Sequence, residues 1–283
     1  MDCREKILSE DYQNLLVDYV EDFDVLTQNE IDYCFLPIDG NFGILYVNRL
    51  NVQPLSISEY RYAFIPKCYG LAAREETPGI FSSVKPVYES QLQQLAGAYE
   101  DSGILRVQQP PLSLTGNGIL IGFIDTGIRY TLPVFRNEDG STKLHSVWDQ
   151  TQQTGEPPQG LPYGTVFSKE AINENLRLRK TDETVPILFA DENGHGTKVV
   201  SVAENAAPQA ELVMVKCRQA KKYLRDYYQI PGTADAYEES DIVAALKYLH
   251  DVSERENKPI VICITMGTNM GDHAGNSFLD QYL

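Results

Sequence analysis

The sequence predicts an α/β protein with a doubly wound, mostly parallel sheet, preceded by a small α/β domain. From residue 118 onward it contains three nearly continuous apolar runs of strand length, GILIGFI at 118–124, ELVMVK at 211–216 and PIVICI at 259–264. Such runs are typical of parallel strands that are covered on both faces. Helical patterns lie between the strands, and an alternation of strands and helices indicates a doubly wound sheet.

The segment up to about residue 75 predicts the small domain. The run DYQNLLVDYV at 11–20 has helical spacing through its apolar residues and predicts a helix. Two strands are expected at 32–37 and 43–48, because these apolar runs flank the turn signal DGN. A short helix near 56–60 and another strand follow. A polar linker broken by Pro and Gly then leads to a further predicted helix, VYESQLQQLAGAY.

Two helices are predicted between the strands of the larger sheet. The first, HGTKVVSVAENA, begins at His195 and leads into the second apolar strand. The second, DIVAALKYLHDV, places four apolar residues on one helical face. The polar stretch from about 150 to 187 is interpreted as an excursion on the surface. We therefore expect a first domain over residues 1–97, linker included, and a second over 98–283.

The composition indicates an acidic globular protein. Apolar residues make up 42% of the chain, with 17 Tyr and 10 Phe among them, which is enough for a real core. A formal net charge of −16 argues against nucleic acid as a partner, because phosphates would be repelled. The N-terminus is too polar for a signal peptide, and no apolar run approaches membrane-spanning length. We expect a soluble, cytoplasmic protein with no membrane partner.

Cysteine usage predicts reduced thiols. The five cysteines are odd in number and scattered, with no CxxC pair, and they are Cys3, Cys34, Cys68, Cys217 and Cys263. This pattern fits an intracellular compartment better than a disulfide framework or a zinc site.

Two polar residues lie at the ends of predicted elements of the larger sheet. Asp125 comes directly after the first apolar strand, and His195 lies between two glycines at the start of a predicted helix. In an open α/β sheet, functional groups gather beyond the carboxyl ends of the strands. We expect Asp125 and His195 to meet there, since a buried carboxylate needs a partner. The alternatives are an ordinary Asp cap and a polar loop tip.

A carboxylate paired with an imidazole makes a general base. The carboxylate fixes the tautomer of the ring and stabilises its protonated form, while the other nitrogen takes a proton from a nucleophile. Histidine suits this role because its pKa lies near working pH. Gly194 and Gly196 are expected to leave room for a substrate backbone beside the ring.

Four segments resemble subtilisin-like serine proteases in residues and in order: IGFIDTGI, NGHGTKVVSVA, AAPQAELVMVK and VICITMGTN. Further motifs, including IPKCYGL, SVWDQT and YGTVFSKEAINENL, are similar to the Csp germination proteases of clostridial spores. The resemblance implies a subtilisin-like fold with Asp125 and His195 as catalytic residues. It also implies that the backbone of Thr265, Met266 and Gly267 pairs with an extended substrate, as an unpaired strand end can.

The sequence departs from the subtilase pattern in three respects. It contains no Gly-Thr-Ser segment, and the serines after His195 are Ser201, Ser240, Ser253 and Ser277, the last interpreted as a loop serine. We therefore expect an N-terminal portion of a longer protease that is inactive by itself. Where many subtilases have a Pro-Asp for calcium, this chain has Pro133-Val134. We therefore expect no cofactor or metal, with calcium as the alternative although its usual ligand position is not matched. Lys198 replaces a second histidine, with no effect expected on the chemistry.

The resemblance implies a serine endopeptidase working by acyl transfer on a protein or peptide substrate. Residues 1–97 would be a propeptide that assists folding and inhibits, and therefore a partner of the enzyme. By analogy with Csp, the substrate would be a cortex-lytic zymogen in spore germination, and the location would be cytoplasmic or spore-associated. The alternative is a pseudoprotease that binds or senses a partner. A nucleotide-binding protein ranks last, because TGNGILIG is no phosphate loop.

Overall fold

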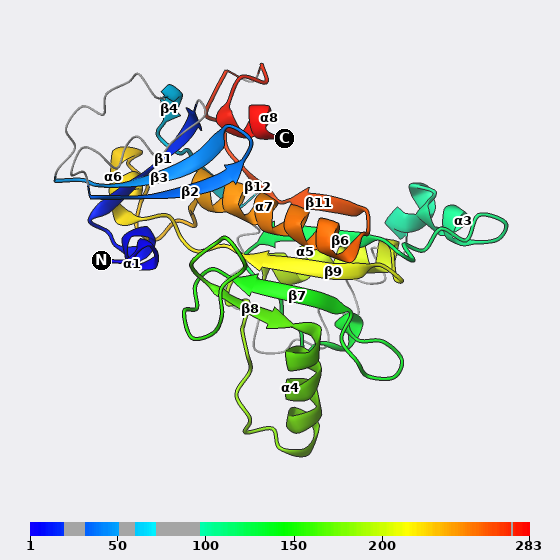
Figure 1. Ribbon diagram of the computed structural model, residues 1–283. Helices are drawn as coiled ribbons and strands as arrows, with labels where there is room; N and C mark the ends of the chain where they lie inside the picture. The colour runs from blue at the N-terminus through cyan, green and yellow to red at the C-terminus, as the bar shows by residue number, and fades with distance from the viewer. Residues whose placement is uncertain (20–31, 51–59, 72–96, 273) are drawn as a thin grey trace.

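The predicted doubly wound sheet is present in the computed structural model. The structure describes residues 1–19, 32–50, 60–71, 97–272 and 274–283 (Figure 1). A five-stranded sheet has the order β11-β6-β9-β7-β8, in which only the edge strand β8 is antiparallel to its neighbour. Its strands are β6 Leu120–Asp125, β7 Leu144–Asp149, β8 Thr165–Ser168, β9 Glu211–Lys216 and β11 Ile260–Ile264. The three apolar runs are therefore strands β6, β9 and β11, as predicted.

Helices cover both faces of this sheet. Alternate residues of the strands enter two core clusters, with Val213 and Val215 in one and Leu212 and Met214 in the other. The helix α7, Glu239–Glu256, packs in the first cluster, and α5, His195–Ala206, packs in the second. Both helices were predicted, and α7 was predicted from its apolar spacing. Shorter helices are η4 Pro133–Phe135, α6 Lys222–Tyr227, α3 Ile104–Gln108 and α8 Phe278–Tyr282.

The polar stretch from 150 to 187 is more ordered than a surface excursion, so that interpretation was wrong in part. It contains β8 and the helix α4, Lys169–Thr181, which begins at the N-cap Ser168. Ile172 and Leu176 of α4 are buried in the second core cluster. The apolar residues of this amphipathic helix are few, which is why its composition resembled a loop.

The N-terminal domain is built on a four-stranded antiparallel sheet with the order β2-β3-β1-β4. Its strands are β1 Tyr12–Tyr19, β2 Tyr33–Asp39, β3 Phe42–Asn48 and β4 Tyr60–Phe64. The predictions of β2 and β3 are confirmed. The helix expected at 56–60 and the linker lie outside the described residues, apart from Tyr60, which begins β4. Of the helix VYESQLQQLAGAY, the described residues 97–99 are helical.

The helix predicted over DYQNLLVDYV is wrong, because residues Tyr12–Tyr19 of this segment form the strand β1. β1 pairs with both β3 and β4, and it is covered on both faces. Leu16 enters the large core cluster, whereas Val17 enters a cluster on the other face. Apolar residues on both faces hide the alternation that marks a strand, and the pairing partners lie far along the chain.

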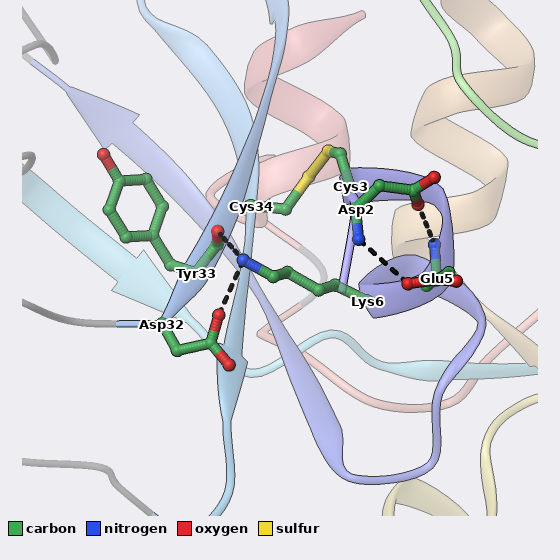
Figure 2. Close-up of a disulfide and its surroundings, with 7 residues drawn as sticks. All are labelled: Asp2, Cys3, Glu5, Lys6, Asp32, Tyr33 and Cys34. Carbon is green, nitrogen blue, oxygen red and sulfur yellow. Dashed lines mark hydrogen bonds and ion pairs between the residues drawn. A yellow bond between two sulfur atoms is a disulfide. The ribbon is translucent and has the colours of Figure 1, made fainter.

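A disulfide joins Cys3 to Cys34, which corrects the expectation that all thiols are reduced (Figure 2). It connects the first helix, α1 Cys3–Leu8, to β2, with 5.2 Å between the Cα atoms. Beside it, Lys6 Nζ lies 2.6 Å from Asp32 Oδ1 and donates to the Tyr33 carbonyl at 2.9 Å. The cysteines are 31 residues apart, so only the packing of α1 on the sheet brings them together. Cys68, Cys217 and Cys263 are free thiols.

The N-terminal sheet packs directly on the larger domain. Leu16 and Tyr46 share one core cluster with Ile242 and Leu246 of α7. A third, three-stranded sheet also connects the two domains, with β5 Cys68–Leu71 between β10 Tyr237–Glu238 and β12 Met266–Gly267. None of the helices in the described ranges has the length and apolar character needed to cross a membrane.

Candidate active site

Asp125 and His195 meet at the carboxyl end of the larger sheet. Asp125 is the last residue of β6 and is fully buried, and His195 is the first residue of α5. His195 Nδ1 lies 2.9 Å from Asp125 Oδ1 and 3.0 Å from Oδ2. This geometry orients the ring and places the proton on Nδ1, because an ionised carboxylate can only accept.

Two further donors satisfy the buried carboxylate. The Thr126 amide donates to Asp125 Oδ1 at 2.6 Å, and the Thr265 hydroxyl donates to Asp125 Oδ2. Burying a carboxylate is costly unless its oxygens are hydrogen-bonded. The loop after β6 and the end of β11 therefore fix Asp125 in place before any substrate is present.

His195 Nε2 has no hydrogen-bond partner among the described residues. The side chain of His195 is 12% exposed, so the ring is held by the protein on one edge and open on the other. An imidazole in this state can accept a proton at Nε2 while the carboxylate stabilises the resulting charge.

Asp191 anchors the start of α5 and was missed by the sequence analysis. This buried carboxylate accepts from the Gly194 amide at 2.8 Å, the Thr197 amide at 2.9 Å and the Thr197 hydroxyl at 2.6 Å. It also accepts from the Thr126 hydroxyl at 2.8 Å, which ties the loop after β6 to α5. An Asp three residues before the N-cap glycine was the available signal, since a carboxylate satisfies free amides at a helix start.

The glycines on either side of His195 are required by the local backbone geometry. Gly194 is the N-cap of α5 with φ of +85°, a conformation that favours glycine. A Cβ on Gly196 would lie 2.2 Å from the Gly127 carbonyl oxygen. Gly196 thus allows the two loops to touch, and the expected room for a substrate backbone at this position is filled by the chain itself.

A cavity of about 500 Å³ lies beyond the ends of β6 and β9, lined in part by Thr126, Glu192, Lys216 and Cys217. Lys216 Nζ is 2.8 Å from Glu192 Oε2. Burial opposes ionisation of Glu192, but the hydrogen bond from Lys216, a backbone hydrogen bond and the positive charges of Lys216 and Arg129 together outweigh it and lower the pKa of Glu192. Burial raises the pKa of the Cys217 thiol well above its usual range, so this cysteine is no thiolate nucleophile.

The segment Thr265–Gly267 is not an unpaired strand end, contrary to expectation. Its β12 residues pair antiparallel with β5, Met266 opposite Leu71 and Gly267 opposite Gly70. The other edge of β5 pairs with β10, where Tyr69 lies opposite Tyr237. A segment of the N-terminal domain therefore occupies the position that the resemblance implies for an extended peptide.

Two of the three other histidines, Ser277 and Pro133-Val134 lie within the described residues. His145 in β7 is within 3.5 Å of Glu256, and burial lowers its pKa despite that carboxylate. His250 is exposed on α7, and His273 lies outside the described residues. Ser277 is the N-cap of α8, where its hydroxyl and Asp280 form a capping box. Pro133-Val134 forms part of η4, and the described ranges contain no group of three metal-ligating side chains.

Comparisons with known proteins find proteases that are similar to this chain. No family model matches the chain. A curated relative, "Subtilisin-like protease SBT2.2" of Arabidopsis thaliana, is 30% identical over 106 residues, which is 34% of this chain and 12% of that protein. The solved structure of the Clostridium perfringens CspB protease matches with 32% identity and a TM-score of 0.52, over 66% of this chain. The match spans 37% of the CspB chain. In sequence and in fold, the chain is similar to subtilisin-like proteases, the CspB protease among them.

Proposed function

We propose that the chain carries the Asp–His part of a subtilisin-type serine endopeptidase centre that acts on a protein substrate. The observation that carries this proposal is the Asp125–His195 pair, with Nδ1 at 2.9 and 3.0 Å from the carboxylate and Nε2 unbonded within the described chain. A buried carboxylate that orients a partly open imidazole is the arrangement a general base requires.

The proton path follows from this geometry. A serine hydroxyl beside Nε2 would attack the carbonyl carbon of the substrate, and its proton would pass to Nε2. Asp125 would stabilise the imidazolium without itself being protonated. The proton would then pass from Nε2 to the leaving amine, and water would release the acyl group by the same route. The 283 residues contain no Gly-Thr-Ser segment to supply that hydroxyl.

The N-terminal domain, residues 1–97 with its linker, would act as an inhibitory propeptide. Its strand β5 lies between β10 and β12, so that both of its edges are paired, as an extended substrate would be. A second peptide cannot pair with β12 while Gly70 and Leu71 remain there. Cleavage of a bond on the C-terminal side of Leu71 would then allow this strand to leave.

The test compares the protein encoded by the complete gene with its His195→Ala variant. We expect hydrolysis of a fluorogenic peptide and self-cleavage near residues 90 to 112, seen by intact mass, and both should be lost in the variant. The Csp resemblance makes a cortex-lytic zymogen the first protein substrate to assay. The 283 residues alone should show no turnover, because the acceleration of about 10⁶-fold supplied by a complete triad needs its nucleophile. Turnover by these residues that His195→Ala abolishes would contradict this expectation.

A pseudoprotease that binds or senses a partner is the second candidate. This candidate is favoured because β5 is paired on both of its edges and therefore blocks the position of an extended substrate. Under this hypothesis the complete protein would retain its N-terminal domain uncleaved and would hydrolyse no peptide. The mass measurement and the hydrolysis assay therefore separate the two functions.

A further inference from the structure

A second cavity lies between the N-terminal sheet and α8. Neither Asp125 nor His195 lines it. It has a volume of about 490 Å³ and is lined by residues of the β2–β3 turn, by Asp18 of β1, and by Gln281 and Tyr282. This volume is in the range of sites that hold small molecules. In Figure 1, α8 lies next to the strands of the N-terminal sheet, so the cavity spans a contact between segments at opposite ends of the sequence.

Two carboxylates flank one aromatic ring in this cavity. In the antiparallel register, Phe42 of β3 lies opposite Asp39 of β2 on one side and opposite Asp18 of β1 on the other. Residues directly opposite each other project from the same face of a sheet. Asp39, Phe42 and Asp18 therefore form a row, and the two carboxylates are two strand spacings apart, about 10 Å.

Asp18 is a buried carboxylate with an unsatisfied oxygen. The residue is only 9% exposed, and its Oδ1, which is shielded from solvent, has no hydrogen-bond partner among the described residues. Neither Asp18 nor Asp39 forms an ion pair within the described part of the chain, and none of the described residues that line the cavity is basic. A buried carboxylate without a partner is costly. The cost would be removed by a cation that enters the cavity.

The walls favour an organic cation over a metal ion. The rings of Phe42 and Tyr282 meet edge to face, with centroids 5.9 Å apart, and aromatic faces attract ammonium and guanidinium groups. Gln281 donates its amide nitrogen to the Asn276 carbonyl, which leaves its amide oxygen as an acceptor. Calcium requires six to eight oxygen ligands, and the described residues contain no group of three metal-ligating side chains.

We propose that this cavity binds an organic cation, a guanidinium or primary ammonium group, between the carboxylates of Asp18 and Asp39 and against the rings of Phe42 and Tyr282. A molecule with a cationic group at each end fits the spacing of the two carboxylates. The site includes no residue of the Asp125–His195 pair, so the proposal is independent of peptidase activity. Because the cavity is formed by both β1–β3 and α8, a bound cation stabilises their contact.

The experiment is calorimetric titration of the full chain with agmatine, which has a guanidinium at one end and an ammonium at the other. We expect saturable binding with one molecule per chain. Asp18→Asn and Asp39→Asn should each weaken binding at least about tenfold, as expected for the loss of a charge-assisted hydrogen bond. Asp11→Asn, which removes an exposed charge before the opposite end of β1, is the matched control and should bind as the wild type does.

Two further measurements make the result decisive. Asp18→Asn should melt at a temperature no lower than the wild type in the absence of agmatine, because it removes an unpaired buried charge, so its loss of binding cannot be attributed to unfolding. N-butylurea, a neutral ligand of similar size, should not bind. Equal agmatine affinity in all variants, or no binding to the wild type, would overturn the proposal. Binding of calcium that is lost in Asp18→Asn and excludes agmatine would also overturn it, in favour of a metal site.

Discussion

At the scale of single residues, two buried carboxylates organise the candidate active site. Asp125 orients His195, and Asp191 holds the loops that carry both of them. Each is surrounded by hydrogen-bond donors, so each is inexpensive to bury. The two differ in what they contact: Asp125 touches the imidazole, whereas Asp191 touches the backbone at the start of α5.

Asp125→Asn should affect chemistry more than stability. The amide is close in shape to the carboxylate, but it can donate as well as accept, so it no longer fixes the proton of His195 on Nδ1. In the protein encoded by the complete gene, we expect kcat to fall about 10⁴-fold with a small change in Tm. If Asp125 is only a structural cap, Tm will fall and kcat will be retained.

Asp191→Ala should have the opposite effect, a loss of stability. The substitution leaves the amides of Gly194 and Thr197 without their acceptor in a buried position. We expect the free energy of unfolding to drop by about 3 kcal/mol, because more than one buried donor would lose its hydrogen-bond acceptor. Urea unfolding measures this change. Asp182→Ala, an exposed acid at the C-cap of α4, is the control, and an equal effect of the two variants would contradict the prediction.

At the scale of elements, α1 depends on long-range contacts for its position. It has six residues, too few to be a stable helix alone, and the disulfide and the Lys6–Asp32 ion pair attach it to β2. It also contacts the larger domain, because Arg218 Nη1 donates to the Ile7 carbonyl at 3.2 Å. α1 therefore lies where the N-terminal sheet meets the rest of the molecule.

Reduction of the disulfide should destabilise the N-terminal domain. The bridge closes a loop with a sequence separation of 31, for which chain entropy gives about 3–4 kcal/mol of stabilisation. We expect a dithiol reductant to lower the urea midpoint of the wild type. The Cys3→Ser, Cys34→Ser double variant should unfold at that lower midpoint with or without reductant. Thiol counting that finds five free thiols in the oxidised protein would show that the bridge does not form.

At the scale of the whole molecule, a buried polar layer joins the two domains. Asn14 of β1 donates to Glu238 at 2.7 Å, and Lys221 Nζ donates to the Tyr12 carbonyl at 3.0 Å. Arg218 Nε lies 2.6 Å from Asp241 Oδ2 and completes the layer. The Asn14–Glu238 and Lys221–Tyr12 hydrogen bonds form only when the N-terminal sheet is docked, so they specify one orientation of the two domains.

Lys221 should give the stability a pH dependence. Burial, with Arg218 adding to it, lowers the pKa of Lys221 to about 8 from 10.5. Between these values the unfolded chain binds more protons than the folded one, so this group makes stability rise with pH. From pH 7 to 9 the wild type should gain about 1 kcal/mol of unfolding free energy relative to Lys221→Met. Urea unfolding of both proteins at the two pH values tests this, and parallel pH profiles would contradict it.

The sequence by itself determined the larger sheet, the two long helices on its faces and the positions of Asp125 and His195 at strand and helix ends. Local periodicity carries this information, because parallel strands covered on both faces read as unbroken apolar runs. Tertiary structure decided the strand β1, the Cys3–Cys34 bridge, the role of Asp191 and the pairing of β12 with β5. Each of these depends on partners far along the chain, which no local pattern of residues specifies.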